Sequence, residues 1–441
     1  MPKIAAKIQT KGFIFDQNKC VGCQACVLAC QIENKTELAY NWRNVHNSNS
    51  YQQSQIPLFY LSIACNHCEE APCMKGCPSN AYHRDAKTNA VLIDSRKCIG
   101  CSYCSWVCPY DAPKLQNGIM QKCTFCEHKL QENEKPACAL NCPVGALDYG
   151  IISDSKNQIP SFTEFGIKPK IDIIPLFNNR KTPFMDVDVL KPAGCPEIII
   201  EEKVEQKIKL KDEWPLALFS FIVATLVGYY FSCLAGNIQF HPIPFFTAAL
   251  AGLGLSLIHL GKPIRAFRAI LNFKYSWLSR EIVFYTLFVG IMAFGYYVDI
   301  KSITLLVLSV VLALLSLISV DQLYRKAATS QKRIFHTGET IYIALFLFLI
   351  SFPQLLVIVV LAKNLIYLIR KLFFVKKDEQ KLLNLTVVKL FFAIVIPAIA
   401  YSTQPIILFA SLAISELIDR FEFYLEMKIV TPEIQLKETN T

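Results

Sequence analysis

The spacing of the cysteines limits what this chain can fold into more than any other feature. The chain has 441 residues and 18 cysteines, and all but two of the cysteines fall into four groups near the N-terminus. The third group has the spacing C-x2-C-x2-C-x3-C followed by proline, and the first lacks only the proline. This run is a ligand pattern of bacterial iron–sulfur clusters. The groups are Cys20, Cys23, Cys26 and Cys30; Cys65, Cys68, Cys73 and Cys77; Cys98, Cys101, Cys104 and Cys108; and Cys123, Cys126, Cys138 and Cys142.

Cysteines this close together favour an iron–sulfur cubane over structural zinc. Zinc prefers two separated pairs of ligands around one tetrahedral ion, and a zinc-stabilised module is the alternative that the spacing leaves open. At four thiolates per cubane, these cysteines predict four [4Fe–4S] clusters. The repeated unit, with short strands such as NAVLID between the groups, predicts a doubled ferredoxin-like α+β domain over residues 1–150. Cys195 has no partner at a suitable spacing, so we expect that it binds no metal.

Long apolar runs after Trp214 contrast with this cysteine-rich head. The whole chain has a mean hydropathy of +0.33 and 18% charged residues, which excludes disorder or a coiled coil as the main architecture. The runs predict an all-α bundle of eight transmembrane helices over residues 214–428, with a tail over 429–441. Residues 151–213 are rich in proline and predict an extended strap, with a plain linker as the alternative. The predicted helices cover 214–235, 243–260, 281–298, 303–321, 338–352, 354–371, 385–402 and 405–425.

Pro353 leaves one boundary open, because it could kink a single helix or separate two. Charge favours two helices, since the second then returns Arg370 and Lys371 to the side that holds the other basic loops. With eight helices both chain ends share that side, and Lys301 is the basic residue of the opposite loops. The basic residues of the shared side are Lys262, Arg265, Arg268, Lys274, Arg280, Arg325, Lys326, Lys332, Arg333, Arg370, Lys371, Lys376, Lys377 and Lys381.

The positive-inside rule then predicts a multi-pass protein of the inner membrane with its head in the cytoplasm. A periplasmic head is the alternative, because basic loops can also bind a partner or a quinone head group. The N-terminal stretch MPKIAAKIQTKGFIFDQ has no apolar run and no twin arginine, so we expect no export signal. The basic loops account for the net charge of +10, and we expect no nucleic-acid partner.

The stretches CVGCQACVLAC, CNHCEEAPCMKGCP, CIGCSYCSWVCPYDAP and KCTFCEHKLQENEKPACALNCPVGAL resemble the four-cluster iron–sulfur subunit of the dimethyl sulfoxide reductase family. The resemblance implies that groups one and four share two clusters and that groups two and three share the others. Because every cysteine of group three is present, it implies no three-iron cluster. The implied ligand sets are Cys20, Cys23, Cys26 and Cys142 for cluster one; Cys123, Cys126, Cys138 and Cys30 for cluster two; Cys65, Cys68, Cys73 and Cys108 for cluster three; and Cys98, Cys101, Cys104 and Cys77 for cluster four.

The stretch HLGKPIRAFRAILNFKYSWLSREI, from His259 to Ile282, resembles the membrane anchor subunit of the same family, as does SELIDRFEFYLE. The chain thus resembles a fusion of two subunits. The resemblance ties His259 and Glu281 to menaquinol, and a neutral imidazole with a carboxylate near the interface could accept the protons that quinol releases. The alternative is that both merely cap helix ends. Arg265, Arg268 and Arg280 could contact a quinone oxygen or the head, or lie in a solvated basic loop.

These observations predict an electron-transfer and membrane-anchoring subunit. It would oxidise menaquinol and relay electrons through four clusters to a separate molybdopterin (Mo-bisMGD) catalytic subunit. A polysulfide- or tetrathionate-reductase-like complex, or a quinone-reducing one, is the redox alternative. The non-redox alternative is the zinc-stabilised module on a membrane transporter. Histidines suited to axial haem ligation in mid-membrane are lacking from the apolar segments, so we expect no haem.

Overall fold

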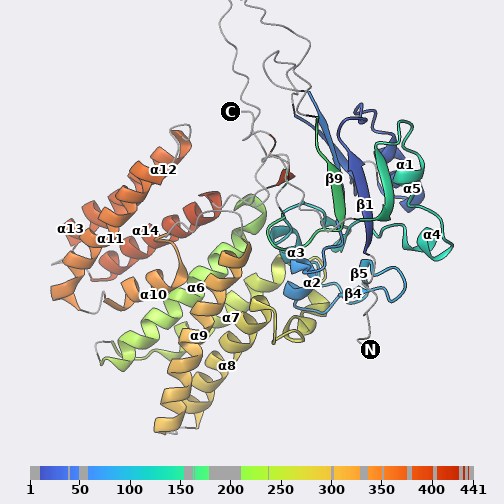
Figure 1. The fold of residues 1–441 in the computed structure, drawn as a ribbon. Coiled ribbons are helices and arrows are strands. Elements are labelled where there is room, and N and C mark those ends of the chain that lie inside the picture. The colour runs from blue at the N-terminus through green and yellow to red at the C-terminus, as the bar shows by residue number, and fades with distance from the viewer. Residues whose placement is uncertain are drawn as a thin grey trace, which may run out of the picture. The chain divides into compact units, whose positions relative to one another are not determined.

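The structure is a computed structural model, and its chain divides into two compact units. The first comprises residues 1–206 and 430–441, and the second comprises residues 207–429 (Figure 1). The predicted non-ligand Cys195 and most of the predicted strap lie outside the described residues. The structure describes residues 10–37, 40–48, 58–152, 162, 164–177, 210–236, 238–298, 302–327, 336–349, 352–374, 380–400, 405–426, 431–432 and 436.

The first unit, called the head, contains a three-stranded sheet. Its central strand β1 (Lys11–Asp16) pairs antiparallel with β8 (Leu147–Ile151) and parallel with β9 (Ile171–Ile174). Phe13 and Phe15 of β1 point into the core and are 1% and 0% exposed. The strand β9 comes from the predicted strap, so this part of it completes the sheet.

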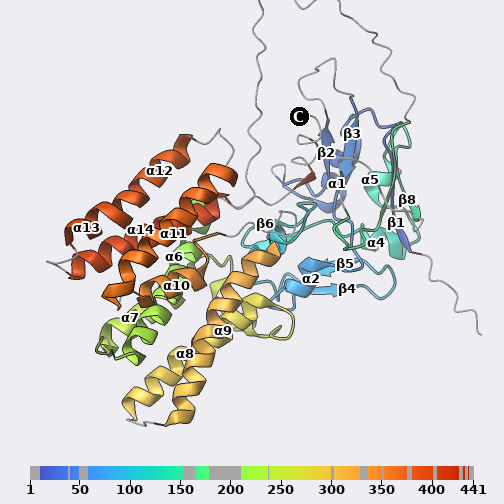
Figure 2. The same ribbon diagram turned by 60° about the vertical axis from the view of Figure 1, so that its left-hand side comes forward.

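Short hairpins and helices fill the head between these strands, as Figure 2 shows. The predicted segment NAVLID forms one strand of such a hairpin, β5 (Val91–Ile93). This α+β arrangement is the ferredoxin-like domain that the cysteine repeat predicts. The other hairpin strands are β2 (Asn44–Asn47), β3 (Tyr60–Ile63), β4 (Tyr82–Arg84), β6 (Lys114–Gln116) and β7 (Ile119–Gln121). The helices are α1 (Ala25–Asn34), α2 (Pro72–Gly76), α3 (Tyr103–Trp106), α4 (Glu127–Gln131) and α5 (Ala137–Leu140).

The internal repeat of the sequence is also a repeat of backbone conformation. Gly22 and Gly100 occupy the same place in groups one and three, and their φ angles are 70° and 71°. The residues that precede α1 and α3, Gln24 and Ser102, also have positive φ, at 63° and 56°. Glycine adopts this left-handed backbone without steric cost. Each loop therefore turns tightly enough to aim several cysteines at one point.

The second unit is helical. The described residues contain three helices long and apolar enough to cross a membrane, α6, α8 and α9, or up to four if α7 and η1 form one bent span. The eight predicted spans are therefore not all established. The helices are α6 (Leu210–Leu234), α7 (Pro242–Ile258), the 3₁₀-helix η1 (Pro263–Ile270), α8 (Trp277–Tyr297), α9 (Ile303–Ala327), α10 (Thr340–Leu349), α11 (Pro353–Phe374), α12 (Gln380–Leu390), the π-helix η2 (Phe391–Val395), α13 (Ile396–Ala400) and α14 (Pro405–Glu426).

The helix α6 lies in the centre of this unit and packs against α7, α9, α10 and α14. Its residues Val223, Ala224 and Val227 are all 0% exposed. The helix α10 lies very close to α6 at Gly228. A β-carbon added at this glycine would lie only 2.8 Å from the carbonyl oxygen of Ala344 in α10. The helix α10 ends at Leu349, and α11 begins at Pro353.

Candidate functional site

Two hollows of the head are lined by cysteines from distant parts of the chain. The first, of about 320 Å³ and partly open to solvent, is lined by Cys20, Cys23 and Cys26 together with Cys142. These four residues are called site 1. Cys20 and Cys23 lie in the loop before α1, Cys26 lies in the first turn of α1, and Cys142 lies between α5 and β8. The hollow therefore joins cysteine groups one and four.

The second hollow, of about 370 Å³, is lined by Cys65, Cys68, Cys73 and Cys108. These residues are called site 3. Three of them belong to group two, and Cys108 is the last cysteine of group three. His67 also lines this hollow and stacks on Phe125 with their ring centroids 3.7 Å apart. Burial and the nearby cation Lys122 hold the pKa of His67 well below its usual value, so its imidazole is neutral.

The other eight cysteines of the four groups also gather in two sets. Cys30 lies close enough to Cys138 and Cys126 to interact with them electrostatically, and Cys123 interacts in the same way with Cys30 and Cys138. Cys101 interacts with Cys77 and Cys98, and Cys104 interacts with Cys101 and Cys77. The two sets are called site 2 (Cys30, Cys123, Cys126 and Cys138) and site 4 (Cys77, Cys98, Cys101 and Cys104).

The four sites follow one another through the head. Cys26 of site 1 neighbours Cys138 of site 2. Cys123 of site 2 neighbours Cys65 of site 3. Cys73 of site 3 neighbours Cys104 of site 4. The order is therefore 1–2–3–4. The end sites reach the surface of the head, since Cys23 of site 1 is exposed and Cys101 of site 4 is half-buried.

The surroundings of the cysteines fit iron–sulfur clusters. Backbone amides of Leu147, Phe125, Met120 and Ala81 each donate to a cysteine sulfur at 3.4 Å, at Cys142, Cys123, Cys98 and Cys77. Such hydrogen bonds to sulfur help to set cluster potentials. Burial raises the pKa of Cys30 to about 12, and the Cys138 thiol adds to this effect. A thiol of this kind ionises at neutral pH only when a metal takes the place of its proton.

Within the described residues, no three His, Cys, Asp or Glu side chains come close enough to hold a single metal ion. Four thiols around a hollow suit a cubane, which carries an iron at each of several corners, better than they suit one tetrahedral zinc ion. This geometry argues against the zinc-stabilised module.

In the helical unit, the two residues predicted for the quinol site lie at helix ends. His259 follows the last residue of α7, and its buried Nδ1 has no hydrogen-bond partner. Glu281 is the fifth residue of α8, is 3% exposed and has its Oε2 without a hydrogen bond. Arg420 of α14 and Asp321 of α9 both lie close enough to Glu281 to interact with it electrostatically. No hydrogen bond or ion pair among the described residues joins His259 directly to Glu281.

The three arginines predicted near this site differ in their contacts. Arg280 donates to the carbonyl oxygens of Phe273 and Lys274 at 3.1 and 2.6 Å, and its guanidinium lies 4.4 Å from the ring centroid of Trp277. Arg280 therefore braces the loop before α8. Arg265 and Arg268 lie in η1, and the Nε of Arg268 is buried without a hydrogen-bond partner.

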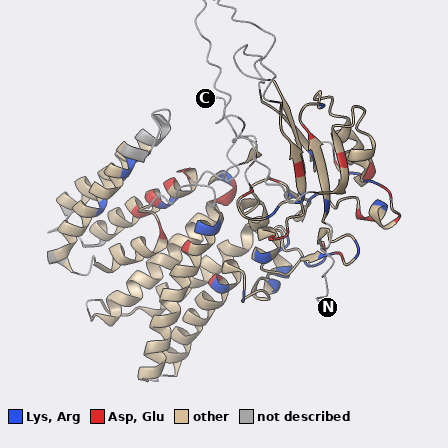
Figure 3. Cartoon of the chain, viewed as in Figure 1, with Lys and Arg blue, Asp and Glu red and all other residues tan. Residues whose placement is uncertain are grey.

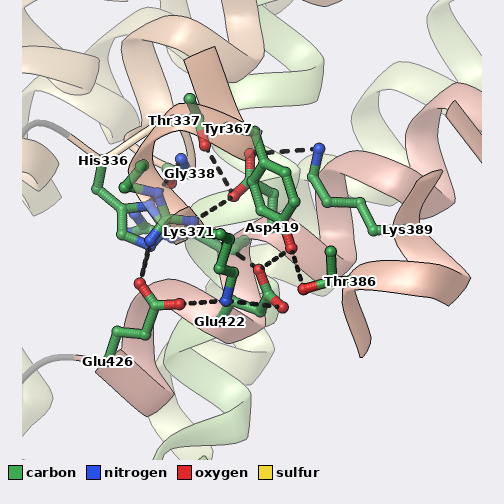
Figure 4. A network of polar contacts seen from close by, with 12 residues as sticks. His336, Thr337, Gly338, Tyr367, Lys371, Thr386, Lys389, Asp419, Glu422 and Glu426 are labelled. Carbon is green, nitrogen blue, oxygen red and sulfur yellow. Dashed lines mark hydrogen bonds and ion pairs between the residues drawn. The ribbon is translucent and has the colours of Figure 1, made fainter. Parts of the chain in front are cut away.

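A network of buried ion pairs holds α14 against α11 and α12 (Figure 4). The acidic residues are spaced so that they share one face of α14, and the cations come from the two facing helices. Asp419, which is 0% exposed, accepts a hydrogen bond from Thr337 at 3.0 Å and lies 3.9 Å from the ammonium of Lys389. The pairs are Lys363 with Glu416, Arg370 with Asp419, Glu422 and Glu426, Lys371 with Glu422 and Glu426, and Lys389 with Asp419.

Sequence reasoning missed this network. In Figure 3 the ribbon of α14 carries several acidic residues, whereas most of α8 is uncharged. Arg420 of α14 donates to the hydroxyl of Ser220 of α6 and to the carbonyl oxygen of Gly338, each at 2.9 Å, and it also interacts electrostatically with Glu281. The i, i+3 spacing of the acids along α14 was the available signal, but their partners are distant in the sequence.

Comparison with known proteins finds a matching family for each of the two units. Residues 56–152 match the 4Fe-4S dicluster domain, and residues 211–413 match the DMSO reductase anchor subunit. One of the chains of the anaerobic dimethyl sulfoxide reductase of Escherichia coli is 35% identical over 188 residues, which cover 39% of this chain and 91% of the relative. One of the subunits of the sulfite dehydrogenase of Allochromatium vinosum is 34% identical over 206 residues, or 38% of this chain and 83% of the relative. The thiosulfate reductase electron transfer subunit of Salmonella typhi is 35% identical over 150 residues, or 33% and 78%.

The head and the apolar helices together define a membrane protein of electron transport that carries 4Fe–4S sites. The chain belongs to the dimethyl sulfoxide reductase family, and it joins the regions of the iron–sulfur subunit and of the anchor subunit in one polypeptide.

Proposed function

We propose that this chain oxidises menaquinol in the membrane and passes the electrons through four [4Fe–4S] clusters to a separate molybdopterin (Mo-bisMGD) catalytic subunit. The observation that carries the proposal is the unbroken order of the four cysteine sites, with end sites that reach the surface of the head. The cysteines of sites 1 to 4 would hold the clusters, which would supply one-electron transfer. Neighbouring sites divide a transfer that is too long for a single step.

The proposed ligands of the clusters are the residues of sites 1 to 4. The support is geometric, because each site draws its fourth cysteine from a different group. The family relationship supports the partner, since the relatives are named as subunits of larger oxidoreductases. Those names include reductases and a dehydrogenase. A complex that acts on a sulfur compound and reduces quinone is therefore the second candidate.

At the proposed quinol site, His259 would accept a proton and Glu281 would pass one onward. Glu281 is suited to this because it is buried, has an oxygen without a hydrogen-bond partner and lies beside Arg420. Arg268, with its buried Nε lacking a partner, is the better placed of the three arginines to bind a quinone oxygen.

The iron content tests the cluster assignment. Protein purified without oxygen should hold about sixteen irons per chain, from four cubanes of four irons each. Replacing Cys101 by serine should affect site 4 alone, so that the iron content falls to between about twelve and fifteen. Iron analysis with electron paramagnetic resonance measures both. A content near eight, or loss of the other clusters in the Cys101 variant, contradicts the assignment.

We also propose eight membrane spans with the head in the cytoplasm. The support is the clustering of basic residues, since the N-terminal end of α8 carries Arg280 and the C-terminal end of α9 carries Arg325 and Lys326. A reporter fused after Thr441 should therefore report the cytoplasm, and one inserted beside Lys301, which lies outside the described residues, should report the outside. The reversed pattern contradicts this orientation and places the head in the periplasm.

A further inference from the structure

Arg43 is a buried cation in the head that the cysteine motifs do not include. It precedes β2, and its side chain is 1% exposed. Its guanidinium lies 4.3 Å from the ring centroid of Phe13, and its Nη1 donates to the hydroxyl of Ser62 at 3.0 Å. The Ser62 hydroxyl is in turn 3.4 Å from the sulfur of Cys26 in site 1. The guanidinium is thus linked to a predicted cluster ligand.

The same guanidinium lies between two of the cysteine sites. Cys26 of site 1 and Cys138, Cys123 and Cys30 of site 2 are its electrostatic neighbours. Its Nε and Nη2 are buried and have no hydrogen-bond partner. Among the described residues, no carboxylate forms an ion pair with it. Two donors of this side chain therefore remain available beside two sites that are built to hold sulfur-rich, negatively charged groups.

Burying a guanidinium is costly unless an opposite charge compensates for it. An iron–sulfur cubane with four thiolate ligands carries net negative charge, and sulfur accepts hydrogen bonds from nearby donors. In the proposed four-cluster state, the charge that Arg43 needs would come from the clusters at sites 1 and 2. In turn, the positive charge of Arg43 would compensate the negative charge of those clusters.

We propose that Arg43 is a built-in counter-charge for sites 1 and 2 and that it raises the reduction potentials of both clusters. The sign follows from the charge change on reduction. A cluster gains one negative charge when it accepts an electron, so a fixed cation nearby stabilises the reduced form more than the oxidised form. Arg43 is therefore a tuning residue that favours the presence of electrons at this end of the relay.

The test is a redox titration of the full-length membrane protein, followed by electron paramagnetic resonance. In the Arg43→Gln variant, the ratio of reduced to oxidised clusters at a fixed potential should fall at least tenfold at two of the four clusters. This corresponds to a lower midpoint potential by about 59 mV for a one-electron couple. The other two midpoints should not move. Arg96→Gln is the matched control, because Arg96 lies beside site 4 but its side chain is 90% exposed, where water screens its charge.

Two further results make the test decisive. The inference rests on the proposed four clusters. The iron content checks that proposal separately, because the wild type must hold about sixteen irons before the potentials are compared. Arg43→Lys keeps the charge but loses the planar fork. The counter-charge role is supported if the Lys variant assembles with potentials near the wild type. This holds both when the Gln variant assembles with lowered potentials and when it loses its clusters. Unchanged potentials in an assembled Gln variant, or loss of clusters at sites 1 and 2 in both variants, overturn it.

Discussion

Replacing His259 by arginine should abolish the reduction of the clusters by a menaquinol analogue. Quinol oxidation releases protons as well as electrons, and a neutral imidazole can accept one of these protons. The guanidinium of arginine does not deprotonate in proteins, so it cannot serve as the acceptor. We expect the rate of cluster reduction in a stopped-flow experiment to fall at least a hundredfold, in line with a typical loss of acid–base catalysis of roughly 10²-fold or more.

The control for this substitution is available on the same helix. His241 precedes the first turn of α7, at the end opposite to His259, and it is exposed. His241→Arg makes the same chemical change and should leave quinol-driven reduction intact. Artificial donors should reduce the clusters of both variants at the normal rate. Normal reduction by the quinol analogue in the His259 variant removes this residue from the mechanism, and failure with both kinds of donor indicates misfolding instead.

The second large effect is expected in the ionic network of α14. Replacing Lys363 by methionine removes the cation that pairs with Glu416, whose side chain is 2% exposed. Breaking one partner of a buried ion pair costs about 3–5 kcal/mol, because the remaining charge stays buried without compensation. The free energy of unfolding of the detergent-solubilised protein should fall by that amount. Lys363→Arg, which keeps the charge, should lose much less.

A double-mutant cycle separates charge from packing in this pair. If the cost of the single change comes from an uncompensated carboxylate, Lys363→Met combined with Glu416→Leu should recover most of the lost stability, because apolar replacements of a whole buried pair are often close to neutral. The coupling energy between the two positions is then large. A double variant as unstable as the sum of the two single variants would mean that the side chains matter for their shape and not for their charges.

Much of the head could be predicted because its signal is local. The turns around Gly22 and Gly100 and the cysteines that they aim lie within a few residues of each other, so their spacing alone indicated clusters. Arg43 could not be found in this way. Its role depends on Ser62 and on cysteines of two distant groups, which only the packing of the chain brings together.

In the helical unit, the sequence alone predicts some helices well and others poorly. Hydropathy identifies α6, α8 and α9 as membrane spans because their sequences are apolar without help from neighbours. The helix α14 carries Asp419, Arg420 and Glu422, all 0% exposed, so its burial depends on ion pairs and hydrogen bonds with other helices. A sequence window cannot contain those partners. The bend of 106° between α7 and η1 is a further feature that an average over apolar residues does not report.

The central position of β1 also sets an order for synthesis on the ribosome. This strand is made before both of its sheet partners, β8 and β9, which follow the last cysteine group. The last cysteine of site 3 is Cys108, whereas the last cysteine of site 1 is Cys142. Pairing between distant segments is slow to form. The strand β1 can therefore be fixed in its sheet only after all four cysteine groups have been made.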